Sequence, residues 1–223
     1  MKQLAENLWL LTYPLPLLGA DFHRNVTVIR LRSGALVIHS TAPFAPVDVA
    51  LISELGRPAW LVDSMLHHDT FAKEGRAAFP GIPFLAPEGF TELVKFPTTP
   101  ILPAPEEWRD ELDALAIQGA PSLKEYVFFH RASRTLIVTD LVFHFGPHTP
   151  IWTKILLKLA LVAGHDPGMS RPFKSAIKDT AAFRRSIATM LEWDFDRLIV
   201  GHGTLIETGA KQQVIAAFKS AGF

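Results

Sequence analysis

The stretch Asp196-Arg197-Leu198-Ile199-Val200-Gly201-His202-Gly203 lies near the end of the chain. Its short apolar run, bounded by glycine, predicts a buried strand that ends in a turn. The two glycines allow the backbone to turn sharply and allow another group to approach closely. The carboxyl ends of buried strands in α/β proteins face the crevice where ligands bind. His202 is therefore either a site residue or a histidine that is hydrogen-bonded within a turn.

Composition limits the classes of function. The 223 residues can bury a substantial core, and Lys+Arg and Asp+Glu are both 22. That balance argues against nucleic acid as a partner, because nucleic-acid surfaces need an excess of basic residues. The chain has no cysteine, so any metal must be bound by His, Asp or Glu. The first residues lack the apolar core of a secretory signal, and we expect a cytoplasmic protein.

Apolar periodicity, glycines and prolines divide the chain into short elements. Strands are predicted at 8–13, 25–31, 35–39, 59–62, 82–86, 112–117, 125–130, 134–140 and 196–200. Helices are predicted at 46–55, 71–79, 87–93, 178–193 and 210–218, and an irregular surface connection at 95–111. Hairpins alternating with βα units predict an α/β protein with two mixed β-sheets and helices outside. We expect a single domain over residues 1–223.

A helical excursion is predicted at about 141–175, and it contains the most apolar segment, 151–163. This segment is too short to span a bilayer and carries Lys154 and Lys158, which share one face of a helix. It can pack on its own core or on a partner subunit, or it can make a peripheral membrane contact.

Polar residues follow four of the predicted strands, and all four groups include residue types that bind metals: His39, His67 and His68, Asp140, and His202. Each has a structural alternative. A strand-end aspartate often caps the next turn, and the histidines could satisfy nearby backbone groups. Taken together, neutral histidine and aspartate suit zinc, iron or manganese, and ligands from separate strand ends can form one site.

The pairs Thr139-Asp140 and Gly201-His202-Gly203 resemble the metallo-β-lactamase fold superfamily. That resemblance implies a four-layer αββα sandwich across nearly the whole chain. Segments such as 133–141 are similar to a divergent bacterial and plant branch, a domain of unknown function with no known activity.

The sequence departs from the superfamily pattern at several ligand positions. His67, His68 and Asp69 replace the His-x-His-x-Asp-His loop, with Thr70 where a histidine would follow. Ala120 stands where the middle Gly-His pair has its histidine, and His39 stands where an Asp is common. The resemblance thus implies a site built from His67, His68, Asp140 and His202 that is mononuclear, or that binds no metal.

Two hypotheses follow. In the first, a hydrolase-like protein uses zinc or another divalent ion to activate water for attack on an ester, amide, thioester or phosphoester. In the second, a non-catalytic relative with a degenerate metal site serves as a binding module for a small molecule, a partner or a membrane. The sequence leaves the substrate, the metal and the oligomeric state open.

Overall fold

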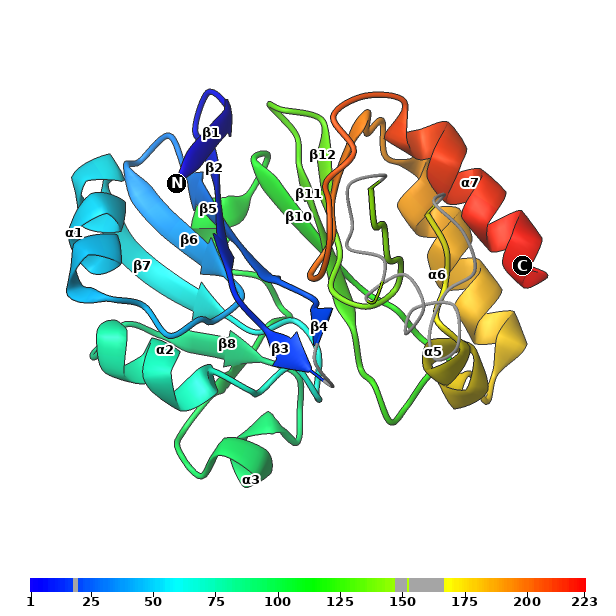
Figure 1. The fold of residues 1–223 in the computed structure, drawn as a ribbon, viewed down its shortest axis with the longest axis horizontal. Helices are drawn as coiled ribbons and strands as arrows, with labels where there is room; N and C mark the ends of the chain where they lie inside the picture. Colours follow the sequence, from blue (N-terminus) through cyan, green and yellow to red (C-terminus); the bar gives the residue numbers. More distant parts are fainter. Residues whose placement is uncertain (18–19, 147–151, 153–166) are drawn as a thin grey trace.

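Two β-sheets face each other in the centre of the molecule, and helices lie on the outer face of each (Figure 1). The computed structural model describes residues 1–17, 20–146, 152 and 167–223. One sheet has seven strands in the order β1-β2-β5-β6-β7-β8-β9, and the other has four in the order β10-β11-β12-β13. β3 and β4 form a separate two-stranded ribbon. This is the expected αββα sandwich with two mixed sheets.

The described elements have the following bounds. The strands are β1 (Lys2–Ala5), β2 (Leu8–Tyr13), β3 (Pro16–Leu17), β4 (Ala20–Asp21), β5 (Arg24–Arg30), β6 (Ala35–His39), β7 (Arg57–Val62), β8 (Phe84–Ala86), β9 (Thr99–Pro100), β10 (Leu112–Ala116), β11 (Tyr126–His130), β12 (Thr135–Ile137) and β13 (Arg197–Ile199). The helices are α1 (Pro46–Leu55), α2 (Ala72–Ala78), α3 (Phe90–Val94), the 3₁₀ helix η1 (Glu106–Trp108), α5 (Arg171–Ala176), α6 (Thr180–Glu192) and α7 (Ala210–Ala221).

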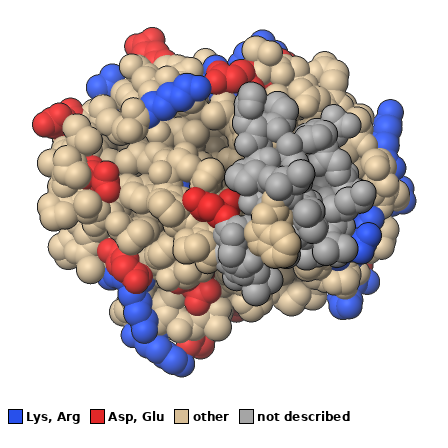
Figure 2. All heavy atoms as spheres, viewed as in Figure 1, with Lys and Arg blue, Asp and Glu red and all other residues tan. Residues whose placement is uncertain are grey.

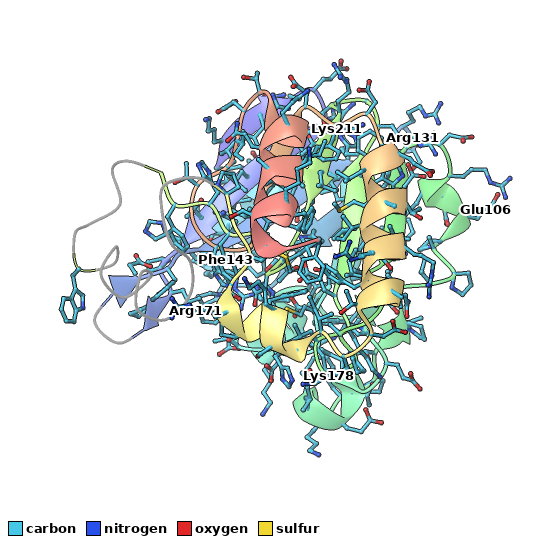
Figure 3. The ribbon with its side chains drawn as sticks, turned by 90° about the vertical axis from the view of Figure 1, so that its right-hand side faces the viewer. Glu106, Arg131, Phe143, Arg171, Lys178 and Lys211 are labelled. Atoms are coloured by element: carbon cyan, nitrogen blue, oxygen red, sulfur yellow. The ribbon has the colours of Figure 1, made fainter. Side chains whose placement is uncertain are left out.

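Three apolar layers hold the sandwich together, because successive strand residues point to opposite faces of a sheet. Val37 of β6 packs in the central layer with Ile199 of β13, whereas the adjacent Ile38 packs in the layer with α1 and α2. Phe183 of α6 and Phe218 of α7 pack in the third layer, on the outer face of the four-stranded sheet. Figure 3 shows these two helices side by side over that sheet.

The topology brings the predicted site residues to one edge of the sandwich. β6, β7 and β8 are parallel neighbours, and so are β12 and β13. Parallel strands connected by helices end at the same edge of a sheet, where ligand sites commonly form. His39 ends β6, His68 follows β7, and Asp140 and His202 follow β12 and β13. The strand ends of both sheets therefore supply the candidate site.

The structure differs from the sequence prediction in several elements. β1, β3 and β4 were not predicted, and residues 95–111 contain β9 and η1. α5 lies at the end of the helical excursion predicted at about 141–175. β12 ends at Ile137 rather than at Asp140, because the backbone N–H groups of Thr139 and Asp140 bond a side chain instead of a neighbouring strand. Most of the predicted excursion, including the segment 151–163 apart from Trp152, lies outside the described residues.

The surface carries charges of both signs. Figure 2 shows acidic and basic side chains interspersed near the rim of one face, with mostly uncharged residues between them. In the ranges that the structure describes, no helix has the length and hydrophobicity needed to cross a bilayer.

Candidate metal centre

His68, Asp140 and His202 come together at the edge where the two sheets meet. Each offers a ligand atom, and these atoms all lie within 4.8 Å of one another. His68 belongs to the loop after β7, Asp140 to the turn after β12, and His202 to the corner after β13. His68 and His202 are buried and Asp140 is partly buried. Three of the four predicted ligands thus form one cluster.

His202 is held in a single orientation. Its Nδ1 lies 2.7 Å from the carbonyl oxygen of His23. A carbonyl can only accept, so Nδ1 carries the proton and donates it. Burial lowers the pKa of His202, although the nearby Asp140 opposes this shift. The imidazole is therefore neutral near pH 7, and its Nε2 has a free lone pair. Phe143 stacks on the ring, with centroids 6.1 Å apart.

That lone pair faces a carboxylate. His202 Nε2 lies 3.5 Å from Asp140 Oδ1, which is buried and has no hydrogen-bond partner among the described residues. Two acceptors that face each other without a proton are unfavourable unless a cation lies between them. Two ligands of one tetrahedral zinc ion are separated by about 3.4 Å, given typical Zn–N and Zn–O distances. The donor set and its spacing therefore fit a divalent metal.

Gly201 and Gly203 make this corner possible, as their positions in the sequence predicted. A Cβ on Gly201 would lie 2.8 Å from the carbonyl oxygen of Thr139. Gly203 has a φ of +94°, and a Cβ there would lie 2.3 Å from the carbonyl oxygen of His144. The corner can thus pack directly against the strand end that leads to Asp140. The bridge between Phe143 and Gly168 also ties the chain beside His202 to the segment that precedes α5 (Figure 3).

His68 has a different neighbour, the buried guanidinium of Arg24. Arg24 Nη1 contacts both ring nitrogens of His68 and lies 3.2 Å from Ser40 Oγ. Guanidinium groups only donate, so neutral His68 accepts this bond with its one lone pair. His68 could therefore bind a metal only if the ion replaced Arg24 as the partner of that lone pair. Burial, followed by the charge of Arg24, lowers the pKa of His68 well below its usual value. Arg24 was not predicted as a site residue, because an arginine at the start of a strand usually indicates solvent exposure.

Carboxylates surround Arg24. Burial lowers the pKa of Arg24, and the charges of Asp63, Asp140 and Asp69 oppose this shift. Asp63 is fully buried and accepts hydrogen bonds from Thr41 Oγ1 at 2.8 Å and Thr41 N at 3.2 Å. Its Oδ1 lies 3.9 Å from His68 Nδ1. Burial raises the pKa of Asp63 to about 7, although the charge of Arg24 opposes this shift. Asp63 thus holds the backbone and hydroxyl of Thr41, and its carboxyl is only partly ionised near pH 7.

The hydrogen bonds of His39 agree with the structural alternative for this residue. Its Nε2 lies 3.0 Å from Ser64 Oγ, which is 2.5 Å from Thr139 Oγ1. This buried chain of three polar side chains connects β6 with the strand ends of both sheets. Burial is the main reason that the pKa of His39 falls to about 3.

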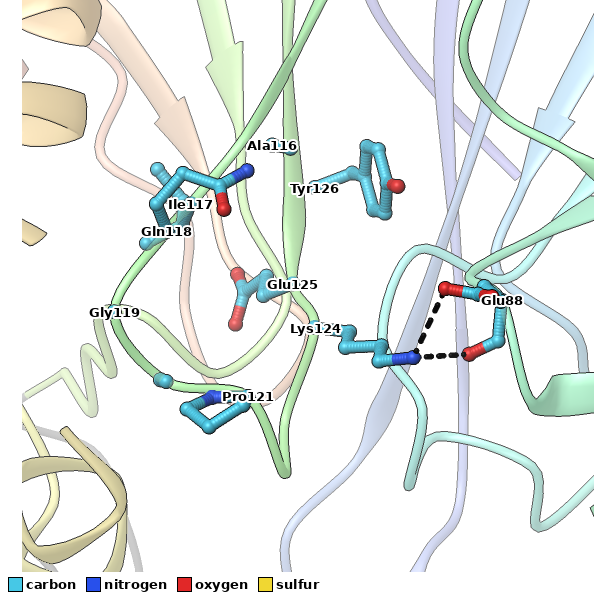
Figure 4. Close-up of a pocket in the computed structure, with 10 residues that line it drawn as sticks. Glu88, Ala116, Ile117, Gln118, Gly119, Pro121, Lys124, Glu125 and Tyr126 are labelled. Atoms are coloured by element: carbon cyan, nitrogen blue, oxygen red, sulfur yellow. Dashed lines mark hydrogen bonds and ion pairs between the residues drawn. The ribbon is translucent and has the colours of Figure 1, made fainter. Parts of the chain in front are cut away.

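Glu125 positions Asp140 through the backbone. Its two carboxylate oxygens accept hydrogen bonds from the N–H groups of Thr139 at 2.8 Å and Asp140 at 3.1 Å. Burial, together with the charge of Asp140, raises the pKa of Glu125 to about 8. Glu125 also lines a pocket of about 290 Å³ beside the 119–121 loop (Figure 4). No sequence pattern indicates this role, because Glu125 is distant from Asp140 along the chain.

The other residues singled out in the sequence lie elsewhere. His67 is exposed, and it is not part of the three-residue cluster. Thr70 is exposed as well, and Ala120 packs in the apolar layer beneath α6.

Solved structures with a similar chain path cover almost the whole protein. A metallo-β-lactamase from Erythrobacter litoralis superposes with a TM-score of 0.68 at 17% identity, covering 98% of this chain and 95% of that one. The chain has the metallo-β-lactamase fold. The DIM-1 metallo-β-lactamase gives a TM-score of 0.65 at 16% identity, with coverage of 99% and 96%. The metallo-β-lactamase FIM-1 from Pseudomonas aeruginosa, solved in its mono-zinc form, gives 0.63 at 13%, with coverage of 97% and 93%.

Comparison of the sequence alone identifies no related family or protein. No family model and no curated protein matches it. Membership of the divergent branch named above stays a prediction. At identities of this order the metallo-β-lactamase fold is shown, and the activity must be argued from the site.

Proposed function

We propose that this protein is a metal-dependent hydrolase with a mononuclear site formed by His68, Asp140 and His202. The observation that carries the proposal is the pairing of His202 Nε2 with Asp140 Oδ1: a nitrogen lone pair faces a buried carboxyl oxygen 3.5 Å away that has no hydrogen-bond partner among the described residues. A divalent ion bound there would polarise a carbonyl or phosphoryl oxygen and lower the pKa of a coordinated water.

Each residue at the site has its own role in the proposed function. His202 presents one lone pair because its other nitrogen donates to the carbonyl of His23. Asp140 supplies the anionic ligand, and Glu125 fixes the backbone that carries it. Phe143 covers the His202 ring and excludes water from that side. An ester, amide, thioester or phosphoester would be the substrate, entering from the partly exposed side of Asp140.

Metal analysis of protein purified without chelators tests the proposal. We expect about one zinc or other divalent ion per chain, lost in His202→Ala. The matched control is His130→Asn, because His130 is a buried histidine that bonds Ser133 away from the site. Hydrolysis of p-nitrophenyl esters and bis-p-nitrophenyl phosphate should require the ion. Absence of bound metal in wild-type protein supplied with zinc would refute the proposal.

The binding-module alternative depended on the segment 151–163. Apart from Trp152, that segment lies outside the described residues, and no described contact favours the alternative.

A further inference from the structure

Arg24 is a buried arginine at the start of β5, with 1% of its surface exposed. Within the described part of the chain, all its hydrogen bonds come from Nη1, which contacts His68 and lies 3.2 Å from Ser40 Oγ. Its Nε is buried and has no partner among the same residues. The guanidinium packs beside the Phe71 ring, 5.6 Å from the ring centroid. In this position Arg24 leaves part of its hydrogen-bonding capacity unused.

The contact between Arg24 and His68 competes with metal binding. A neutral imidazole has one lone pair, and Nη1 contacts both ring nitrogens, so the guanidinium covers that lone pair in either tautomer. The same ring supplies the His68 atom that lies within 4.8 Å of the ligand atoms of Asp140 and His202. An ion and a guanidinium cannot share one lone pair. His68 can therefore bind the ion only after Arg24 has moved away.

Asp63 offers the displaced guanidinium another acceptor inside the protein. The Asp63 carboxyl is fully buried, and its Oδ1 lies 3.9 Å from His68 Nδ1, on the ring that Arg24 contacts. Thr41 supplies its two hydrogen bonds from the described residues, through N and Oγ1. Carboxyl oxygens can accept more than one bond each, so acceptor capacity remains for Arg24. An arginine that exchanges one buried acceptor for another avoids the cost of an unpaired buried charge.

We propose that Arg24 exchanges partners when a metal binds: it contacts His68 in the metal-free protein and pairs with Asp63 once His68 binds the ion. This inference rests on the proposed function, because it concerns the same site. Arg24 acts through His68, so it is a positioning residue. The exchange makes zinc affinity depend on the strength of the contact between Arg24 and His68.

Crystal structures of the wild-type protein with and without zinc test this exchange directly. Without zinc, the guanidinium should contact His68. With saturating zinc, located by its anomalous signal, His68 should bind the ion and the guanidinium should lie within hydrogen-bond distance of Asp63. A guanidinium that stays on His68 in the zinc-bound protein would overturn the exchange while leaving the hydrolase proposal standing. No zinc at the site would overturn both.

Zinc titration calorimetry of a double-mutant cycle measures the competition in solution. Arg24→Met should bind zinc about tenfold tighter than wild type or more, because no hydrogen bond from a charged donor has to be broken. Removal of a positive charge also tightens the binding of a cation, so the same substitution is made in His68→Ala. The gain should be about tenfold larger with His68 present than in His68→Ala. Equal gains in the two backgrounds would show that Arg24 acts through its charge alone and would overturn the exchange.

Arg30→Met, at the other end of β5, is the matched control. Arg30 bonds Asn7 and Leu55 away from the site, so its replacement should leave zinc affinity unchanged. The two crystal structures require no variant, so they decide the question if Arg24→Met does not fold.

Discussion

Asn25 Nδ2 lies 2.9 Å from the carbonyl oxygen of Val200, and this hydrogen bond joins the seven-stranded sheet to the corner that carries His202. The same nitrogen donates to the carbonyl of Gly203 at 3.0 Å, and the backbone N–H of Asn25 donates to Gly201 at 3.0 Å. Asn25 thus fixes the backbone on both sides of His202, although the two residues are far apart in the sequence.

We expect Asn25→Asp to destabilise the fold and to disturb the site. Aspartate has nearly the same shape, but its carboxylate would face the two carbonyl oxygens that now accept hydrogen bonds. Unsatisfied buried groups of this kind cost about 2 kcal/mol or more. Urea unfolding should show the loss, and zinc affinity should fall because the corner shifts. A control is Thr12→Val, which removes only the donor to Asn25 Oδ1 and should cost less.

Glu125→Gln should weaken metal binding about tenfold with a smaller effect on stability. The two carboxyl oxygens of Glu125 now accept from two backbone N–H groups. Glutamine has only one acceptor oxygen, and its NH₂ group would face the second backbone N–H, so two donors would meet without an acceptor. Changes in groups that orient a ligand typically lower metal affinity by about 10–100-fold.

Glu88→Gln is the matched control for that change. Glu88 lines the same pocket, and its exposed carboxylate lies 3.4 Å from Lys124 Nζ. Its replacement should leave metal affinity unchanged. Equal effects of the two substitutions would show that Glu125 does not act through Asp140.

His39 should make stability depend on pH below neutrality. Its pKa is about 3 in the folded protein and about 6.5 when unfolded, so only the unfolded state gains a proton between these values. Stability from neutral His39 is therefore complete above about pH 6.5 and is lost as pH falls towards 3, with a limiting slope of about 1.4 kcal/mol per pH unit.

The comparison of wild type with His39→Gln isolates this contribution. Glutamine can still bond Ser64 but does not titrate in this range. Asp63 and Glu125, with pKa values raised to about 7 and about 8, act in the opposite sense because they favour the folded state at low pH. They are present in both proteins, so the difference in unfolding free energy should shrink as pH falls from 6.5. A constant difference would contradict a neutral, buried His39.

Gly201→Ala should separate Asp140 and His202, two of the proposed metal ligands. The added methyl group would meet the carbonyl oxygen of Thr139 at 2.8 Å, and relief requires the strand ends that carry Asp140 and His202 to move apart. We expect a loss of about 1–3 kcal/mol, typical of overpacking, together with reduced zinc affinity. Gly222→Ala is a control outside the site: nothing lies within 4 Å of its Cβ position, but its φ of +94° disfavours alanine. It should therefore cost some stability and leave zinc affinity unchanged.

The sequence predicted the sandwich and much of the site because both depend on local patterns. Buried strands such as β6 have continuous apolar runs, and the Gly-His-Gly corner has the composition that close packing requires. His68, Asp140 and His202 follow strands, so topology alone brings them to one edge. The choice between His67 and His68 could not be made, because it depends on how an irregular loop turns.

Sequence analysis did not identify Arg24 and Glu125 as residues near the site, for a different reason. Both are charged residues whose burial depends on partners distant along the chain: His68 for Arg24, and the Thr139–Asp140 backbone for Glu125. Residue type alone predicts exposure for such groups. Each contact forms only when segments distant along the chain come together within one sheet: the seven-stranded sheet for Arg24 and His68, and the four-stranded sheet for Glu125 and the Thr139–Asp140 backbone.

Three consecutive residues at the start of β5 have different partners: His23 accepts from His202, Arg24 donates to His68, and Asn25 donates to Val200. β2 pairs with this segment, with Thr12 opposite Asn25 and Tyr13 opposite Arg24. A shift of one residue in this pairing would turn the side chains of Arg24 and Asn25 to the opposite faces of the sheet. It would also displace the backbone carbonyl of His23, so we expect all three contacts to be lost together. An insertion or deletion between β2 and β5 would therefore disturb the proposed metal site, even though it changed none of the proposed ligands.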